Sequence, residues 1–267
     1  MNTQPDYAER LDVGGEILRV MQYDRLSYAD GLAKQRKFLE QVIEYEGAEH
    51  VLLFLEHDPV ITIPPKEIAQ QHLVASVDHL AKLGIEVCET DRGGDITYHG
   101  PGQLVAYPIL KMSKFGLNLS KYMRLLEQVV IGTLKAYGIK AHREPGATGV
   151  WVRPSMESNA VDESSHDAYA DLKHEAGKGM SGVSEKICAM GVRIRKNVTM
   201  HGLALNLSTD LTHFQTIVPC GLAGRPVTSM NKILGDAAPS MQTLMKEMTA
   251  HFAVNLEKAI QSDTKGV

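Results

Sequence analysis

The sequence is poor in cysteine, and this argues against two kinds of small stabilised fold. Its 267 residues include only Cys88, Cys188 and Cys220, and no CxxC or CxxxC spacing joins any two of them. Three scattered cysteines cannot build a disulfide framework, and their spacing does not match a structural zinc site. We therefore expect reduced thiols.

Long apolar runs and an excess of basic charge are also missing. Nowhere do about 18 consecutive apolar residues occur, and the N-terminal stretch MNTQPDYAERLD lacks a basic segment followed by an apolar one. The net charge of -4 and pI near 6.3 give no basic footprint. We expect a cytoplasmic protein that does not act on nucleic acid or a membrane.

Motifs for phosphate and metal binding are lacking too. There is no GxxxxGK[ST], no GxGxxG that opens a helix, and no HExxH or HxH cluster despite eleven histidines. The sequence therefore predicts no metal site and no nucleotide cofactor.

The elements that are present predict an α/β fold, a mixed sheet with flanking helices. The length suits one catalytic domain over residues 1–267, and no internal repeat is visible. The expected strands are 16–26, 50–57, 85–90, 95–99, 103–110, 149–153, 186–194 and 198–208. The expected helices are 27–47, 77–84, 118–137 and 240–260, with a proline-rich loop at 57–70.

Residues 154–184 interrupt the strand that begins with GVWVR. The segment is rich in Ser, Asp, Glu and Gly and poor in large aliphatic side chains. Such a composition cannot bury enough apolar surface to offset the entropy of ordering the chain. We predict a disordered insertion.

The stretch DRGGDITYHGPGQ, residues 91–103, has glycines that allow backbone to pass close to a ligand. Arg92, Tyr98 and His99 add polar groups, and strand alternation places Tyr98 and His99 on opposite faces. The alternative interpretation is a glycine-rich hairpin with a hydrogen-bonded histidine.

Lys186 opens the strand KICAMGVRI. Alternation places Lys186, Cys188, Met190 and Val192 on one face. A lysine on the apolar side of a strand is partly desolvated, and desolvation lowers the pKa of a lysine toward the range useful for proton transfer. The alternative is a lysine that reaches solvent at the end of the strand.

Cys220 lies between Pro219 and Gly221 in TIVPCGLAG, as on an accessible turn. Cys88 and Cys188 lie in apolar strand patterns typical of packing, although Cys188 shares a predicted face with Lys186. A thiolate needs a nearby cation or proton acceptor, for which Lys186, His99 and His201 are candidates.

The strand VTMHGLALNLS mixes apolar residues with small ones. Gly202 and Ala204 leave volume beside it, as in the wall of a narrow apolar groove, and His201 and Asn206 add polar groups.

Four separated blocks, in one order, resemble the lipoyl(octanoyl) transferase family. They are RGGDITYHGPGQLVAYPIL, then GVWV, then KICAMGVRI with NVTMHGLALNLSTDL, then IVPCG. The resemblance extends from about Ser27 to Gly221. It implies a fold similar to the catalytic domain of biotin and lipoate protein ligases.

The resemblance also implies the reaction and its partners. An octanoyl group would pass from octanoyl-acyl carrier protein to a thioester on Cys220, and then to a lysine of a lipoyl domain. Lys186 matches the family's lysine, which favours the thiolate and acts as acid and base. The acceptors would be lipoyl domains of 2-oxoacid dehydrogenase complexes and the glycine cleavage H protein, with no ATP or other cofactor.

The family's acyl pocket maps onto three segments of this chain, by resemblance. These substrate-binding residues are Arg92, Gly93, Gly94, Asp95, Ile96, Thr97, Tyr98, His99, Ala189, Met190, Gly191, Gly202, Leu203 and Ala204.

Two segments depart from the family pattern. PPKEIAQ replaces a Thr-x-Gly turn at one rim of the pocket, and the insertion at 154–184 is longer than the usual connection. Because the partners are acidic in the family and this chain is net negative, we expect a local basic patch of Arg193, Arg195 and Lys196 to bind them.

Two other functions fit the same blocks. One is an ATP-dependent lipoate or biotin ligase, which activates an acid as an adenylate and needs no nucleophilic cysteine. The other is a non-catalytic protein that binds acyl carrier or lipoyl domains.

Overall fold

The computed structural model describes residues 4–153, 183–218 and 225–264. A large sheet runs in the order β1-β2-β3-β7-β11-β10-β9-β8, and a small one in the order β5-β4-β6. The large sheet comprises β1 (Tyr7–Val13), β2 (Glu16–Leu26), β3 (Glu49–His57), β7 (Gln103–Ile109), β8 (Ala141–Glu144), β9 (Ala147–Val152), β10 (Glu185–Arg195) and β11 (Val198–Asn206). The small sheet comprises β4 (Val60–Ile63), β5 (Glu86–Glu89) and β6 (Thr97–His99).

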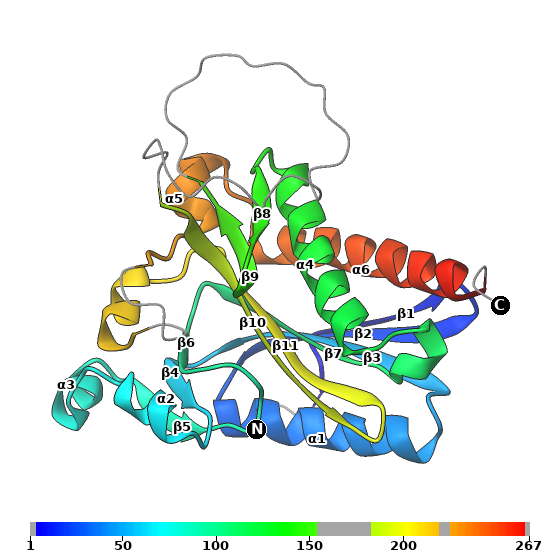
Figure 1. Cartoon of the computed structure of the whole chain (residues 1–267), viewed down its shortest axis with the longest axis horizontal. Coiled ribbons are helices and arrows are strands. Elements are labelled where there is room, and N and C mark those ends of the chain that lie inside the picture. The colour runs from blue at the N-terminus through cyan, green and yellow to red at the C-terminus, as the bar shows by residue number, and fades with distance from the viewer. Residues whose placement is uncertain (1–3, 154–182, 219–224, 265–267) are drawn as a thin grey trace.

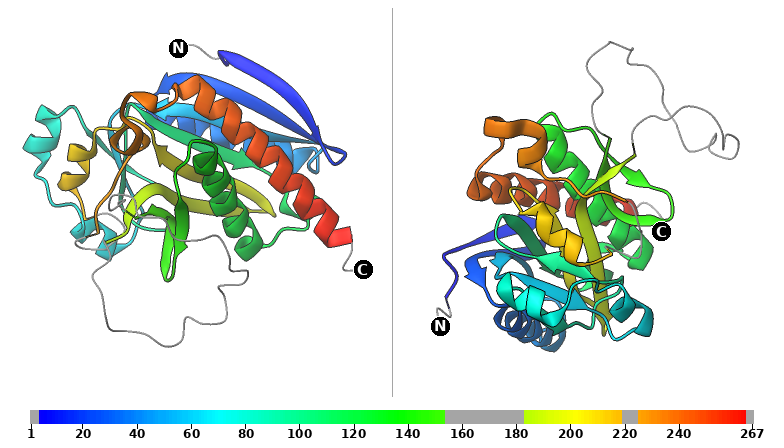
Figure 2. Two further views of the ribbon diagram at one scale, coloured as in Figure 1. Left: turned by 90° about the horizontal axis from the view of Figure 1, so that it is seen from above. Right: turned by 90° about the vertical axis from the view of Figure 1, so that its left-hand side faces the viewer.

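Helices cover both faces of the large sheet (Figure 1). Helix α1 (Tyr28–Glu44) lies on one face, and α4 (Leu119–Ala136) and α6 (Met241–Thr264) lie side by side on the other (Figure 2). Strand β3 is buried on both faces: Leu52 and Phe54 join the core under α4 and α6, whereas Leu53 joins the core under α1. The predicted mixed sheet with flanking helices is confirmed, with β2 and β3 as a parallel pair among antiparallel ones.

Local signals place the helix ends. The Ser27 side chain accepts a hydrogen bond from the Asp30 backbone N–H at the start of α1, and Asn118 does the same for Lys121 at the start of α4. Gly138 follows α4 with a φ of 76°, which suits glycine at a helix end. Leu119, in the first turn of α4, is 52% exposed and does not belong to the buried face of the helix.

The predicted loop at 57–70 is wrong. It contains β4 and the short helix α2 (Glu67–Gln71), followed by α3 (Val77–Lys82). Pro59 and Pro64 flank β4 rather than interrupt it, so each of its backbone groups can still pair with β5 and β6.

The strands on either side of HGPG do not form a hairpin. β6 pairs with β4 in the small sheet, whereas β7 pairs with β3 and β11 in the large one. The turn at 100–102 therefore carries the chain between sheets, and this opens a space between the 92–99 segment and the large sheet.

The chain from β10 to the C-terminus follows the predicted order. β10 and β11 form a hairpin through Lys196 and Asn197, both with positive φ. The short helices η2 (Leu211–Thr216) and α5 (Met230–Leu234) lie between β11 and α6. The predicted insertion and the predicted nucleophile Cys220 lie outside the described residues, apart from Val183 and Ser184. Within the part of the chain that is described, no helix is both long and apolar enough to cross a bilayer.

Candidate active site

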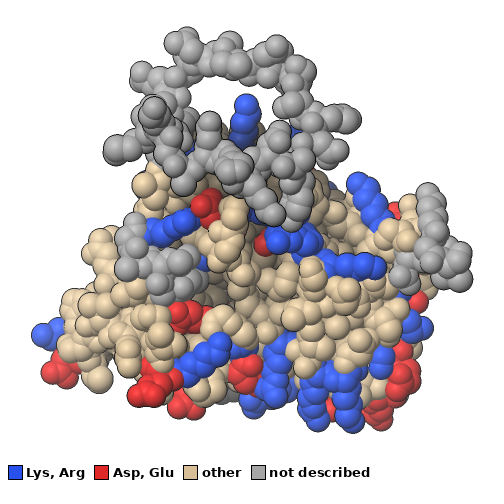
Figure 3. All heavy atoms as spheres, viewed as in Figure 1, with Lys and Arg blue, Asp and Glu red and all other residues tan. Residues whose placement is uncertain are grey.

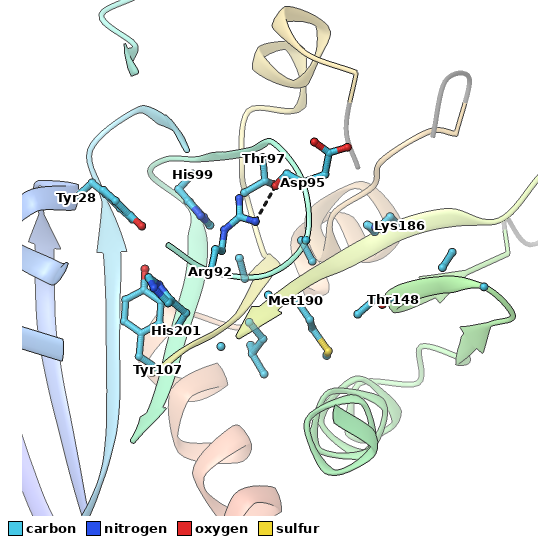
Figure 4. A pocket seen from close by; sticks show the side chains of 18 residues that line it. Tyr28, Arg92, Asp95, Thr97, His99, Tyr107, Thr148, Lys186, Met190 and His201 are labelled. Atoms are coloured by element: carbon cyan, nitrogen blue, oxygen red, sulfur yellow. Dashed lines mark hydrogen bonds between the residues drawn. The ribbon is translucent and has the colours of Figure 1, made fainter. Parts of the chain in front are cut away.

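A cavity of about 290 Å³ lies between the 92–99 segment and strands β10 and β11 (Figure 4). Residues 146–148, around the start of β9, line one end. Tyr28 of α1 and Tyr107 of β7 line the other end. The site is therefore built from segments that are distant in the sequence.

Glycines allow the walls to approach one another. A Cβ atom on Gly202 would lie 2.2 Å from the Ala106 carbonyl oxygen, and one on Gly191 would lie 2.6 Å from the Gly93 carbonyl oxygen. The Gly93 N–H donates to the Val192 carbonyl at 2.9 Å, which attaches the 92–94 turn to β10. Small residues are thus required here by backbone packing as well as by the ligand space.

Arg92 shapes the glycine-rich turn. Its Nη1 donates to the Asp95 carbonyl at 2.7 Å, and its Nη2 donates to Thr62 Oγ1 at 2.9 Å. The guanidinium therefore fastens the turn to β4 while it lines the cavity.

Lys186 lies at one end of the cavity and is only 7% exposed, so it is not a solvent-facing lysine. Its backbone N–H donates to the Pro226 carbonyl, and its carbonyl accepts from the Thr228 N–H, each at 2.9 Å. Trp151, its neighbour on β9, lies beneath the ammonium group, with Nζ 4.7 Å from the ring centroid. Arg225 contacts the same indole at 5.2 Å.

The predicted common face of Lys186 and Cys188 is wrong. The ladder between β9 and β10 shifts register between these residues, and such an irregularity disrupts the alternation of side chains. Cys188 packs in the hydrophobic core with no exposed surface, whereas Lys186 and Ala189 line the cavity. Burial raises the pKa of the Cys188 thiol well above its usual value.

The end of the cavity opposite Lys186 carries a group of rings (Figure 4). His99, Tyr107 and His201 line it and are all nearly buried. Burial lowers the pKa of His99 to about 3 and also lowers that of His201. Both imidazoles are therefore neutral at physiological pH.

His201 has an unusual backbone conformation for a strand residue, with a φ of 59°. Its N–H donates to Gln35 Oε1 at 2.8 Å, and its Nε2 lies 2.7 Å from Asp91 Oδ1. These contacts from α1 and from the 91–92 turn stabilise a backbone conformation that residues other than glycine rarely adopt.

The structure places most of the predicted substrate-binding residues around this one cavity. Those in its lining are Arg92, Gly94, Asp95, Thr97, His99, Ala189, Met190, Gly191, Gly202, Leu203 and Ala204. Gly93 is in the turn but not in the lining. Ile96 and Tyr98 point away and pack in the core of the small sheet, as alternation predicts for Tyr98 against His99.

Sequence reasoning missed Tyr28, Tyr107 and the 146–148 segment, which also line the cavity. The available signal was weak: Tyr107 is a polar-tipped residue in an otherwise apolar strand. Asn206, singled out in the sequence, lies behind the wall, where it hydrogen-bonds Gln103 and the Thr228 carbonyl.

The described residues on either side of 219–224 are attached to the cavity walls. Val218 donates its N–H to the His72 carbonyl at 2.8 Å, and His72 Nδ1 lies 2.8 Å from Oδ2 of the cavity residue Asp95. On the other side, Pro226 bonds the backbone of Lys186. Cys220 itself lies outside the described residues.

Basic side chains gather along the edge formed by α1 and the end of the β10–β11 hairpin (Figure 3). Two of the three residues predicted for a basic patch are already ion-paired: Arg193 with Asp91, and Arg195 with Glu40. Both arginines remain partly exposed, at 44% and 47% of the side chain. Among the described residues, no three His, Cys, Asp or Glu side chains converge as metal ligands would.

Curated relatives of this chain carry the name octanoyltransferase. The sequence model of the lipoyl protein ligase A/B catalytic domain matches residues 27–253. An octanoyltransferase of Solibacter usitatus is 41% identical over 87% of the chain and 90% of its own length. An octanoyltransferase of Christiangramia forsetii is 38% identical over 84% of this chain and 87% of its own length. The chain spans only 39% of a longer octanoyltransferase of Porphyromonas gingivalis, with 37% identity over 79% of the chain.

Solved structures agree on the fold. A lipoate-protein ligase A bound with ATP superposes with a TM-score of 0.60 at 16% identity, over 90% of this chain and 84% of the other. A bipartite lipoate protein ligase of Thermoplasma acidophilum superposes with a TM-score of 0.57 at 17% identity, over 87% of this chain and 82% of the other. At these identities the likeness concerns the fold alone.

Proposed function

This chain belongs to the lipoyl protein ligase A/B catalytic domain family, and on that premise we propose that it transfers octanoyl from octanoyl-acyl carrier protein through a thioester on Cys220. The reaction class is octanoyl transfer in protein lipoylation, which makes the protein an acyltransferase. The acyl donor, the covalent intermediate and the acceptor lysine are the proposed parts.

In the first step, the Cys220 thiolate attacks the carbonyl carbon of the donor thioester. The carbon–sulfur bond to the carrier breaks, and the carrier thiol leaves with the proton that Lys186 took from Cys220. In the second step, the ε-amine of a lipoyl-domain lysine attacks the Cys220 thioester. The amide forms, Lys186 receives a proton from the amine, and this proton returns to the Cys220 sulfur.

The observation that carries the proposal is the position of Lys186. It is a nearly buried lysine at the end of a cavity, and it is backbone-bonded to the described residues that follow Cys220. On the preceding side, Val218 is attached through His72 to the cavity residue Asp95. Short connections on both sides support a nucleophile at the Lys186 end of the cavity.

The other two cysteines are poor nucleophiles. Cys188 is fully buried in the core. Burial, together with the neighbouring Glu86, raises the pKa of Cys88 to about 11, and Cys88 does not line the cavity. A thiol with a raised pKa is almost entirely protonated at neutral pH and attacks slowly.

We further propose that the octanoyl chain lies along the cavity with its thioester end at Lys186. Met190, Leu203 and Ala204 then supply apolar contacts from β10 and β11. Burial of an alkyl chain is worth about 0.8 kcal/mol per CH₂, so most of the affinity for the acyl group would come from these walls.

The proposed acceptors are lipoyl domains of 2-oxoacid dehydrogenase complexes and the glycine cleavage H protein, and the proposed location is the cytoplasm. The partly exposed Arg193 and Arg195 are the proposed contacts for acidic partner surfaces, together with Lys196. Steering by such a patch weakens as salt rises, so KM for the protein substrates should increase with ionic strength.

Mass spectrometry after mixing with octanoyl-acyl carrier protein tests the mechanism. The wild-type protein should gain one octanoyl group without ATP, and Cys220→Ala should gain none. Lys186→Ala should acylate much more slowly, and an unchanged rate would disprove its role. If Cys220→Ala instead transferred octanoate only when ATP was added, the chain would be a ligase. A pure binding protein would show no covalent mass at all.

A further inference from the structure

The two ends of the cavity differ in chemistry. Lys186 and Thr148 lie at one end, whereas Tyr28, His99, Tyr107 and His201 turn toward one another at the other (Figure 4). An alkyl chain needs no polar groups at its far end. The protonation of these rings shows what this second end is suited to bind.

The hydroxyl hydrogen of Tyr107 is already donated to an acceptor within the protein. His57 Nδ1 lies 3.0 Å from the Leu26 carbonyl, which can only accept, so Nδ1 carries the hydrogen. Burial lowers the pKa of His57 to about 4, so its Nε2 is bare and accepts from the Tyr107 hydroxyl at 2.8 Å. The Tyr107 oxygen therefore has lone pairs, but no hydrogen, left for a ligand.

His99 is fixed in the same way. The Gln103 amide nitrogen donates to Asn206 Oδ1 at 2.9 Å and to the Tyr98 carbonyl at 3.3 Å, so the Gln103 oxygen faces His99. That oxygen lies 2.7 Å from His99 Nδ1, which must carry the hydrogen. His99 is 6% exposed, and its bare Nε2 has no hydrogen-bond partner among the described residues.

His201 completes the pattern. Its Nε2 faces the Asp91 carboxylate, which can only accept, so Nε2 carries the hydrogen. Its Nδ1 is left as an acceptor. The three side chains have therefore donated their hydrogens to protein partners, and their remaining polar atoms are acceptors.

We propose that this end of the cavity is a subsite for a hydrogen-bond donor, and that the protein transfers ω-hydroxyacyl groups as well as octanoyl. The proposal rests on the proposed function, because it takes the thioester end of the chain to lie at Lys186. A terminal hydroxyl would donate to His99 Nε2 or Tyr107 Oη, whereas a methyl group would leave these acceptors without a partner. A buried polar site strongly discriminates against a ligand that lacks the matching group.

The test compares acyl chains of equal size on acyl carrier protein. Thioesters of 6-hydroxyhexanoate, 8-hydroxyoctanoate and 10-hydroxydecanoate are each paired with the methyl-ended chain of the same length: heptanoyl, nonanoyl and undecanoyl. Transfer to a lipoyl domain is followed by mass spectrometry. For at least one pair, kcat/KM should be about tenfold higher for the hydroxy chain. If every hydroxy chain is transferred no faster than its methyl-ended partner, the subsite does not exist.

Two variants locate the effect. Tyr107→Phe and His99→Phe should each lower the ratio of hydroxyacyl to methyl-ended transfer. Tyr122→Phe is the matched control, because it removes a buried hydroxyl that lies 3.4 Å from the Pro108 carbonyl and outside the cavity lining. An unchanged ratio in both cavity variants would overturn the assignment. Octanoyl transfer, measured in parallel, reports on the proposed function separately: its absence would reject that function, whereas its presence without hydroxyacyl preference rejects only the subsite.

Discussion

Replacement of Trp151, the only tryptophan in the chain, is expected to slow acyl transfer out of proportion to its effect on folding. The indole is 1% exposed, and its Nε1 donates to the Ala147 carbonyl at 3.2 Å. The Lys186 ammonium lies 4.7 Å from the ring centroid. The indole ring therefore holds Lys186, the proposed acid and base, in position.

The size of the effect follows from the burial of this contact. A cation–π contact contributes about 0.5–1 kcal/mol when exposed and about 2 kcal/mol when desolvated, and Lys186 is almost buried. Two kcal/mol corresponds to about a thirtyfold change in rate. Trp151→Leu should therefore slow acylation by about thirtyfold, whereas Trp151→Phe, which keeps a weaker aromatic ring, should slow it by only a few-fold.

The assay is single-turnover formation of the acyl-enzyme, quenched and followed by mass spectrometry across a pH series. Phe252→Leu is the matched control: Phe252 is fully buried in α6 and is not part of the cavity lining. Unfolding in urea shows how much stability each variant loses. The reasoning is refuted if folded Trp151→Leu acylates at the wild-type rate, or if Phe252→Leu of equal stability is slowed as much.

Three further predictions concern packing, pH and the insertion. Gly202→Ala should cost about 1–3 kcal/mol in urea unfolding, because its Cβ would lie 2.2 Å from the Ala106 carbonyl oxygen; unchanged stability would contradict the close approach. Burial lowers the pKa of His57 in the folded protein to about 4, whereas a histidine in the unfolded chain has a pKa of about 6.5. Between these two pH values, His57 therefore binds more protons in the unfolded chain than in the folded one. Stability should therefore fall by about 3 kcal/mol as pH drops from about 6.5 toward 4, and this part of the loss should vanish in His57→Gln. Replacing residues 154–182 by a short turn should preserve transfer, because the flanking ends of β9 and β10 are already paired; a large loss of activity in the folded variant would contradict this.

The contents of the site could be read from the sequence where the signal is local. The helix starts at Ser27 and Asn118, the alternation of Tyr98 and His99, and the glycines near the ligand space each depend on a few neighbouring residues. Backbone geometry and hydrogen-bond demand act over that same range, so such features survive in any fold that keeps the segment intact.

Other features depended on which strands become neighbours. The irregularity in the ladder with β9 moves Cys188 into the core, and no pattern within β10 marks it. Tyr28 and Tyr107 reach the cavity only because α1 and β7 lie beside β11 in the folded protein. Trp151 lies next to Lys186 because β9 and β10, which are distant in the sequence, pair so that these two residues are opposite each other. The sequence specifies the chemistry of each side chain, but packing of the whole chain decides the order and register of the strands in the sheet. That order and register determine which side chains meet.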